Sequence, residues 1–215
     1  MVALKSDTSQ TRTRQQLLEA AGQVFAEHGY RAATVREICL RAGANVASIH
    51  YHFGDKERLY IAVLRYAHER SNEANPDLSR PNDSNSPEEQ LKIFVRSFLT
   101  QLLERSPLAW DGKLIAREMV EPTSAIDIVI DERMKPLSKR VRDIVRSLLG
   151  VNATEDSIRE SEFSIVSQCV FYHHCREAIL RLYPKFKATG PEIDKLADHI
   201  TAFSLAGLKA KAQRK

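Results

Sequence analysis

Cysteine is scarce in this chain of 215 residues, which has only Cys39, Cys169 and Cys175. Three cysteines are too few for a disulfide framework and are typical of a protein kept in a reducing compartment. Long apolar runs are missing too, since no stretch approaches the roughly 18 apolar residues of a membrane span. The first residues also lack the apolar core of a secretory signal. We therefore expect a cytoplasmic protein with no membrane partner.

The motifs that mark common enzyme classes are absent as well. The sequence contains no G-x-S-x-G, glycine-rich phosphate loop or H-E-x-x-H pattern, so we expect no enzyme and no cofactor. Cys169 and His173 stand four residues apart on one expected helix and could share a metal ion. Only these two ligands would face the same way, so we favour a structural thiol, a hydrogen-bonded histidine and no metal site.

The most informative stretch present is Thr34 to Phe53. Thr34 and Glu37 form a T-x-x-E capping box, which predicts a helix starting after Thr34. Gly43 ends that helix at little steric cost, and Asn45 can cap a second helix running to about Tyr51. Two short helices joined by a glycine-containing turn are the helix-turn-helix pattern.

The second helix has the surface of a DNA reader. Ile49 and Phe53 could point inward, whereas the other residues are small, polar or amphipathic. Small side chains let a backbone approach the major groove, and Asn, Ser and His offer groups for base edges. Tyr51, His52 and Lys56 suit phosphate contacts. The alternative is a short polar connector in a helical bundle that does not bind DNA.

The sequence from Thr13 to Leu59 resembles the DNA-binding domain of the TetR family of bacterial repressors. The resemblance lies in the following runs: Leu17–Ala21, Phe25–Tyr30, Ala33–Ile38, Arg41–Gly43 and Ile49–Lys56. The chain departs from the family at Ala44, Val46 and His50, which we expect to affect which operator is read. The resemblance also implies that an N-terminal arm with Arg12 and Arg14 touches the DNA backbone, although a solvated tail is an alternative. The expected DNA-binding residues are Arg12, Arg14, Thr34, Asn45, Ala47, Ser48, His50, Tyr51, His52 and Lys56.

Helical periodicity and breakers predict an all-α protein. The resemblance implies a TetR-like arrangement, with a three-helix head and a larger helical body. We expect a DNA-binding domain at 1–54, a connecting helix at 55–71, a loop at 72–86, and an effector-binding and dimerisation domain at 87–215. The first helix should run from Thr13 to His28. The last two long helices should run from Thr154 to about Tyr183 and from Pro191 to about Lys211.

The last two helices also carry the expected dimer interface. Large and small apolar residues alternate on one stripe, so a second copy could pack there as a four-helix interface. TetR-like proteins dimerise in this way, and two-fold operators need two-fold proteins. The alternative is that both helices pack only on their own chain. The expected residues are Ile158, Ile165, Ile193, Leu196, Ala197, Ile200, Ser204 and Gly207.

A narrower resemblance concerns Arg117–Ala125 together with Gln168, Cys169 and Tyr172, which resemble the C-terminal domain of the CecR-type subgroup. That resemblance implies a regulator that responds to a small, often drug-like molecule. Large apolar side chains with a few polar ones could line its pocket, although each aromatic alone could be ordinary core. The expected effector-binding residues are Phe94, Phe98, Leu102, Trp110, Leu114, Arg117, Glu118, Met119, Gln168, Phe171, Tyr172 and His173.

Together these patterns predict a homodimeric transcriptional repressor that an apolar or amphipathic effector releases from double-stranded operator DNA. The alternatives are a transcriptional activator, a metal-responsive regulator, or an enzyme fused to a DNA-binding head. The sequence supplies no catalytic set for the last of these.

Overall fold

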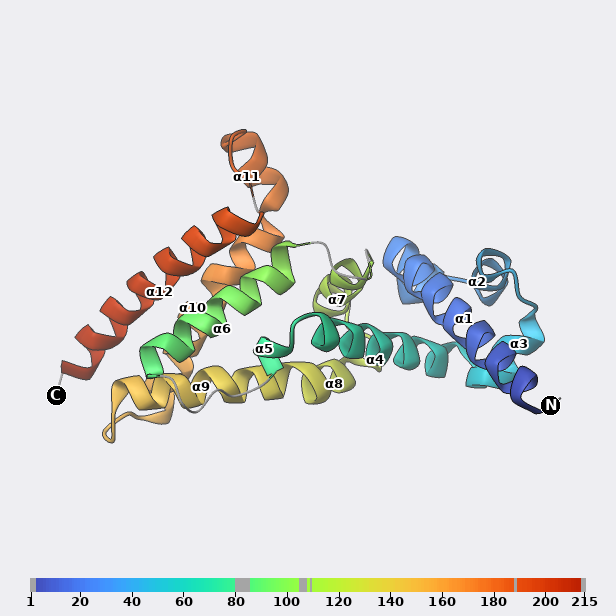
Figure 1. The fold of residues 1–215 in the computed structure, drawn as a ribbon, viewed down its shortest axis with the longest axis horizontal. Coiled ribbons are helices and arrows are strands. Elements are labelled where there is room, and N and C mark those ends of the chain that lie inside the picture. The colour runs from blue at the N-terminus through green and yellow to red at the C-terminus, as the bar shows by residue number, and fades with distance from the viewer. Residues whose placement is uncertain (1–2, 80–85, 105–107, 109, 188, 214–215) are drawn as a thin grey trace. The chain divides into compact units, whose positions relative to one another are not determined.

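The computed structural model describes residues 3–79, 86–104, 108, 110–187 and 189–213 of the chain. Helices make up the regular structure of these residues, and no strand occurs among them (Figure 1). The all-α prediction is therefore confirmed. Within the described residues, no helix combines the length and apolar character that a bilayer crossing requires.

The helices pack as two units. The first unit consists of Met1–Ser71 with Ser106–Arg133, and the second of Asn72–Arg105 with Met134–Lys215. This division differs from the expected one, which placed all of 87–215 in a single body. Residues 106–133 belong to the first unit because Trp110 and Leu114 are buried in the same core as the N-terminal helices. The DNA-binding role expected of 1–54 and the effector-binding and dimerisation roles expected of 87–215 stay predictions.

Local capping builds the helices of the first unit. In α2 (Val35–Ala42), the Thr34 side chain accepts a hydrogen bond from the Glu37 backbone N–H, and Gly43 ends the helix at φ 62°. In α3 (Val46–Phe53), the Asn45 side chain accepts from the Ser48 N–H. These caps confirm the helix-turn-helix boundaries predicted from the sequence.

The other first-unit elements are longer or more irregular than expected. Helix α1 spans Ala3–Ala32 and has non-helical backbone at Gly29, whereas we expected Thr13–His28. Helix α4 spans Lys56–Ala74, so it continues into the expected loop at 72–86, of which 80–85 lie outside the described residues. The remaining elements are α7 (Asp111–Val120), α8 (Ile126–Val129) and the π-helix η1 (Ile130–Met134).

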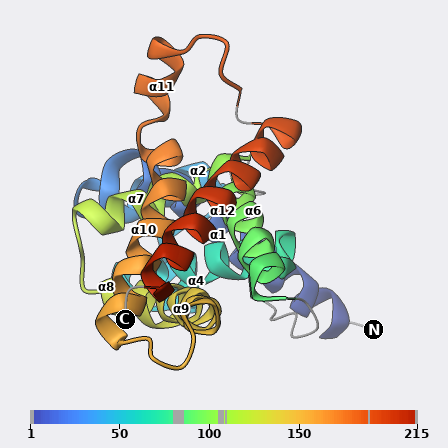
Figure 2. The ribbon, with the colours of Figure 1, turned by 90° about the vertical axis from the view of Figure 1, so that its left-hand side faces the viewer.

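The second unit is a helical bundle with its own core. Its elements are α5 (Pro76–Ser79), α6 (Pro87–Leu103), α9 (Lys135–Leu149), α10 (Glu155–His174), α11 (Arg176–Leu182) and α12 (Gly190–Gln213). Helix α6 packs against α9, α10 and α12, and Figure 2 shows α11 projecting beyond the neighbouring ends of α10 and α12. The helix expected from Thr154 to Tyr183 is interrupted, because Cys175 adopts a non-helical backbone (φ −96°, ψ 14°).

Candidate nucleic-acid interface and effector region

Helix α3 presents one buried face and one exposed face. Ile49 is fully buried and Phe53 is 8% exposed, so both anchor the helix in the first-unit core. Tyr51 is 71% exposed, and Asn45, Ala47 and His50 are exposed as well. The structure therefore brings the expected base-reading residues together on the solvent side of α3.

The ring of His50 is held in a defined orientation. Its Nδ1 lies 2.7 Å from the carbonyl oxygen of Gly54, four residues later. A carbonyl can only accept, so Nδ1 must carry the proton, and the Nε2 of a neutral ring is then an acceptor. Ser48 is also held locally, because its hydroxyl donates to the Asn45 side chain over 3.0 Å.

The basic side chains expected to contact phosphates differ in how many contacts they make within the protein. Lys56 is half-buried: its Nζ lies 4.8 Å from the centre of the Tyr30 ring and donates to the Arg31 carbonyl over 3.3 Å. Burial lowers the pKa of Lys56. The guanidinium of Arg14 lies 5.4 Å from the centre of the Phe53 ring, whereas Arg12 is exposed. Lys56 therefore fastens the start of α4 to the end of α1 as well as supplying charge.

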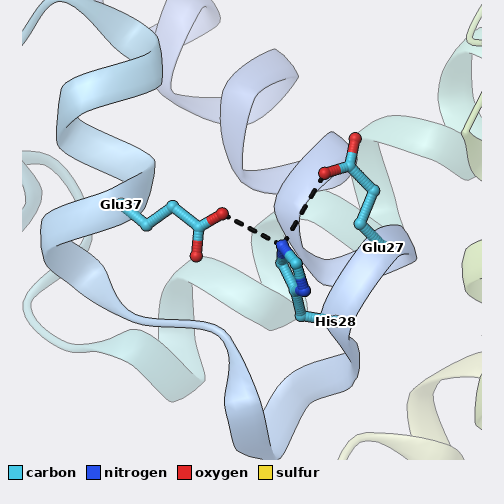
Figure 3. Close-up of side chains that lie close together, drawn as sticks. All are labelled: Glu27, His28 and Glu37. Atoms are coloured by element: carbon cyan, nitrogen blue, oxygen red, sulfur yellow. Dashed lines mark ion pairs between the residues drawn. The ribbon is translucent and has the colours of Figure 1, made fainter.

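Three side chains in the first unit come close enough to hold a metal ion: Glu27, His28 and Glu37. Figure 3 shows the His28 ring between the two carboxylates, with Nε2 3.0 Å from Glu37 and 3.7 Å from Glu27. Arg41 already pairs with Glu27 at 2.9 Å and Glu37 at 3.6 Å, and its hydrogen bond lowers the pKa of Glu27. The positive charge of Arg41 disfavours a cation there, so the cluster serves to join α1 to α2.

Two adjacent residues of α7 connect it to α1 and α4. Arg117 donates to the carbonyls of Ala26 at 3.2 Å and Glu27 at 3.1 Å, which lie near the end of α1. Glu118, which is 1% exposed, accepts from the Tyr60 hydroxyl of α4 at 2.7 Å. Its other oxygen accepts from both the backbone N–H and the hydroxyl of Thr123 at 2.9 Å. Both side chains were expected in the effector pocket, but here their polar groups are used in contacts inside the first unit.

Trp110 and Leu114 are likewise core residues of the first unit. The indole Nε1 of Trp110 donates to Glu19 over 3.2 Å, and its ring covers Gly22, where an added Cβ would lie 2.3 Å from ring atoms. Leu114 is fully buried in that core, whereas Met119 is 38% exposed. Five of the twelve expected effector residues, Trp110, Leu114, Arg117, Glu118 and Met119, thus belong to the first unit.

The other seven expected effector residues belong to the second unit. The Phe94 and Phe98 rings are 5.8 Å apart in its core, and His173 Nδ1 donates to the Leu102 carbonyl over 2.8 Å. Gln168 donates to the Ser164 carbonyl over 2.9 Å. Tyr172 stacks on Phe186, but its neighbour Phe171 is 54% exposed. The structure therefore divides the expected pocket between the two units.

Most of the expected dimer residues are buried in their own chain. At most 2% of the residue surface is exposed at Ile158, Ile165, Ile193, Ala197 and Ile200, and Ser204 is 7% exposed. These side chains fill the second-unit core, and Leu196 packs against that core, so they cannot also form the contact face with a second copy. Of the set, Gly207 is exposed.

Comparison with known proteins decides the family. Residues 17–63 match the family of bacterial regulatory proteins called tetR, and residues 87–208 match the C-terminal domain of the HTH-type transcriptional dual regulator CecR. The second match alone spans more than half of the chain. The chain belongs to the TetR family, with a CecR-type C-terminal domain.

This TetR-family regulator has relatives along most of its length. It is 26% identical to CecR of Shigella flexneri over 177 residues, which is 79% of each protein. It is also 26% identical to the transcriptional repressor NicS of Pseudomonas putida over 174 residues, or 78% of this chain and 79% of NicS. The fold matches the crystal structure of AibR in complex with isovaleryl coenzyme A and operator DNA, with a TM-score of 0.62 and 20% identity. That match covers 89% of this chain and 97% of AibR, and it establishes the shared fold.

Two residues of this TetR-family protein were missed in the sequence. Arg58, whose side chain is 74% exposed, lies in the first turn of α4 beside Asp55, and its position one turn from the end of α3 could have suggested a phosphate contact. Tyr60 holds Glu118 across 58 residues of sequence. No local pattern could have indicated that second contact.

Proposed function

We propose that this TetR-family regulator binds a two-fold operator as a homodimer and represses transcription until a small effector releases it. The observation that carries the proposal is the exposed face of α3. Asn45, Ala47, His50 and Tyr51 lie on that face and are exposed to solvent. A helix kept only for packing would not present such a face. The protein acts where the operator DNA is, in the cytoplasm, and no catalytic step is part of the proposal.

Sequence would be read mainly by His50. With Nδ1 engaged by Gly54, the Nε2 of the neutral ring is left to accept from a base edge. In the major groove the amino groups of adenine and cytosine are the donors. We therefore propose that, on the strand it contacts, His50 favours adenine or cytosine over guanine or thymine, which offer acceptors at their major-groove edges. Arg12, Arg14, Lys56 and Arg58 supply phosphate contacts that are independent of sequence.

The homodimer would form on the outer side of α10 and α12. A groove of about 250 Å³ lies there, with small residues Ser164, Ser204 and Gly207 along it. Phe203, also at the groove, is 67% exposed, and Phe163 on α10 is 61% exposed. Exposed aromatic side chains beside small residues suit close packing of a second pair of helices.

The test is selection of operator DNA from a random pool with the purified full-length chain. We expect a palindromic site whose half-sites lie about 10 base pairs or a multiple of that apart. Transcription from a promoter carrying this site should fall when the protein is added. A rise would instead support the hypothesis that the protein is an activator. That hypothesis is considered because the similar CecR of Shigella flexneri is named a dual regulator. Failure to enrich any sequence would contradict the proposed function.

A further inference from the structure

The π-helix η1 carries Arg133, a partly buried arginine whose Nη1 atom is buried. This Nη1 atom has no hydrogen-bond partner among the described residues. Arg133 lines a small, partly open cavity together with apolar residues of α4, α7 and α8, with His68, and with the ion-paired Arg65 and Glu132. The apolar residues are Leu64, Ile115, Ile128 and Val129. The cavity has a volume of about 10 Å³, which is enough for about one water molecule.

The charge at this cavity is incompletely neutralised. Burial lowers the pKa of Arg133, which means that its charged form is poorly solvated, and only Asp111 acts in the opposite direction. Its neighbour Glu132 also lines the cavity, but its carboxylate is already paired, because it accepts three hydrogen bonds from Arg65 of α4, the shortest of 2.7 Å. A buried donor without an acceptor is costly, so an anion that reached Nη1 of Arg133 would lower that cost.

The backbone around Arg133 gives a second and independent reason to consider this cavity a functional site. Residues 130–134 form a π-helix. Pro136 follows two residues after it, in the first turn of α9, and has no N–H to donate to the Glu132 carbonyl. Single π-helical turns of this kind are frequently found at functional sites, and they interrupt the regular hydrogen-bond ladder. The segment that carries Arg133 is therefore less tightly held than an α-helical turn.

We propose that this cavity is the closed form of the effector site, and that its ligand is a small organic carboxylate with an apolar tail. The inference rests on the proposed function and names the class of effector. The carboxylate accepts from Arg133 Nη1, and the tail lies against Leu64, Ile115 and Val129. A monoanion fits better than a phosphate dianion. Arg65, the other arginine at the cavity, is already paired with Glu132, so a second negative charge would have no free cation to pair with.

The same geometry gives a route to the DNA-binding helices. In the closed form the cavity has no room for a tail, so η1 must move away from α4 when the ligand enters. That movement pulls on the Arg65–Glu132 ion pair. Arg65 lies two helical turns after Arg58 on α4, and α4 is also fixed to α7 through Tyr60 and Glu118. A ligand that favours the open form thereby shifts the position of α4.

The experiment measures binding of two matched pairs of probes to the full-length protein by calorimetry: hexanoate against hexanamide, and benzoate against benzamide. Each pair has the same apolar tail and differs in charge. We expect at least one acid to bind about ten-fold or more tightly than its amide, because a charge-assisted hydrogen bond is lost in the amide. Phosphate and acetate, which lack a tail, should bind more weakly than that acid.

Two variants locate the binding. Arg133→Met should reduce the acid-to-amide preference to about one, since the charge partner is lost. Arg140→Met, which removes a partly buried arginine bound to the Asp77 carbonyl in the second unit, should keep the wild-type preference. Ile128→Trp leaves Arg133 in place but fills the cavity, so it should abolish binding of the acid. Circular dichroism and thermal unfolding verify that each variant is folded.

Three results would overturn the inference. The first is that no acid binds at millimolar concentration, which would mean that the cavity holds a single water only. The second is that acid and amide bind equally, and the third is that Ile128→Trp binds the acid like the wild type. Operator binding is measured on the same preparations. Retained operator binding with no carboxylate effect rejects the effector class and leaves the proposed function standing. Loss of operator binding by the untreated wild type would reject the proposed function itself.

Discussion

The hydroxyl of Tyr60 donates a 2.7 Å hydrogen bond to the carboxylate of Glu118, and both groups are buried. Burial and this hydrogen bond raise the pKa of Tyr60 well above its usual range. The pair joins α4 to α7, two helices whose contact residues are 58 positions apart in the sequence. Because Arg117 beside Glu118 binds carbonyls at the end of α1, α7 fixes two of the helices that support α3.

Removing Glu118 should destabilise the protein strongly. Glu118→Ala leaves the Tyr60 hydroxyl and the Thr123 N–H without their acceptor, and leaving buried polar groups unsatisfied costs about 1–3 kcal/mol each. We expect the free energy of unfolding to fall by about 2–5 kcal/mol, as measured by urea denaturation at fixed protein concentration. The control is Glu121→Ala at an exposed position at the end of α7, which should change it by less than about 0.5 kcal/mol. Equal effects of the two substitutions would contradict the role of the Tyr60–Glu118 bond.

His50 should determine the preference at one base pair of each half-site. His50→Ala removes the acceptor offered to an adenine or cytosine amino group, so discrimination at that position should fall by about 1–3 kcal/mol. Repeating operator selection with the variant measures this directly. Tyr51→Phe is the matched control on the same helix, because it changes a hydroxyl assigned to the phosphate backbone. If H50A selects the same sequence as the wild type, His50 does not read a base.

Lys56 and Arg58 should act on affinity for all DNA sequences. Each of Lys56→Ala and Arg58→Ala is expected to lower the slope of log affinity against log salt by about one, with the preferred operator unchanged. The control Lys139→Ala removes the same charge from α9, where Lys139 pairs with Asp143, and should leave the slope as it is. A change of operator preference in K56A without a change of slope would refute the assignment. Lys56→Ala should also lower stability slightly, because its contacts with Tyr30 and Arg31 are lost.

The homodimer prediction can now be tested without disturbing the core. Gly207 is exposed, with no atom within 4 Å of an added Cβ, and Phe203 is 67% exposed. Gly207→Glu and Phe203→Glu should give folded monomers that bind a half-site weakly, because a buried unpaired charge opposes association. Val151→Glu, which places the same charge on an exposed turn, serves as the control. Sedimentation of G207E and F203E as intact dimers would reject this face as the interface.

Ala197 is unsuitable for that experiment. A charged side chain there would be expected to disrupt the homodimer on the basis of the sequence pattern alone. However, Ala197 is fully buried within its own chain, so a bulky charge would damage the second-unit core before it reached any interface. Periodicity identifies the apolar stripe of a helix, but it does not say whether that stripe faces its own chain or a partner.

Local chemistry made several structural features predictable. Thr34 and Asn45 cap helices through their side chains, as the sequence indicated, and Thr154 caps the helix expected to begin there. A capping hydrogen bond joins residues three apart, so its partner is visible in the sequence itself. The buried and exposed faces of α3 followed from spacing for the same reason, because helical periodicity is a local property.

The sequence by itself determined the all-α class, the helix-turn-helix with its caps, and the residues that face outward on α3. Only the tertiary structure decided that 106–133 pack with the N-terminal helices, that Arg117 and Glu118 support α1 and α4, and that the Nη1 atom of Arg133 is buried at a cavity. Those features depend on contacts between residues far apart in the chain. Such contacts are selected by the fit of whole helices against one another, which no short pattern of residues encodes.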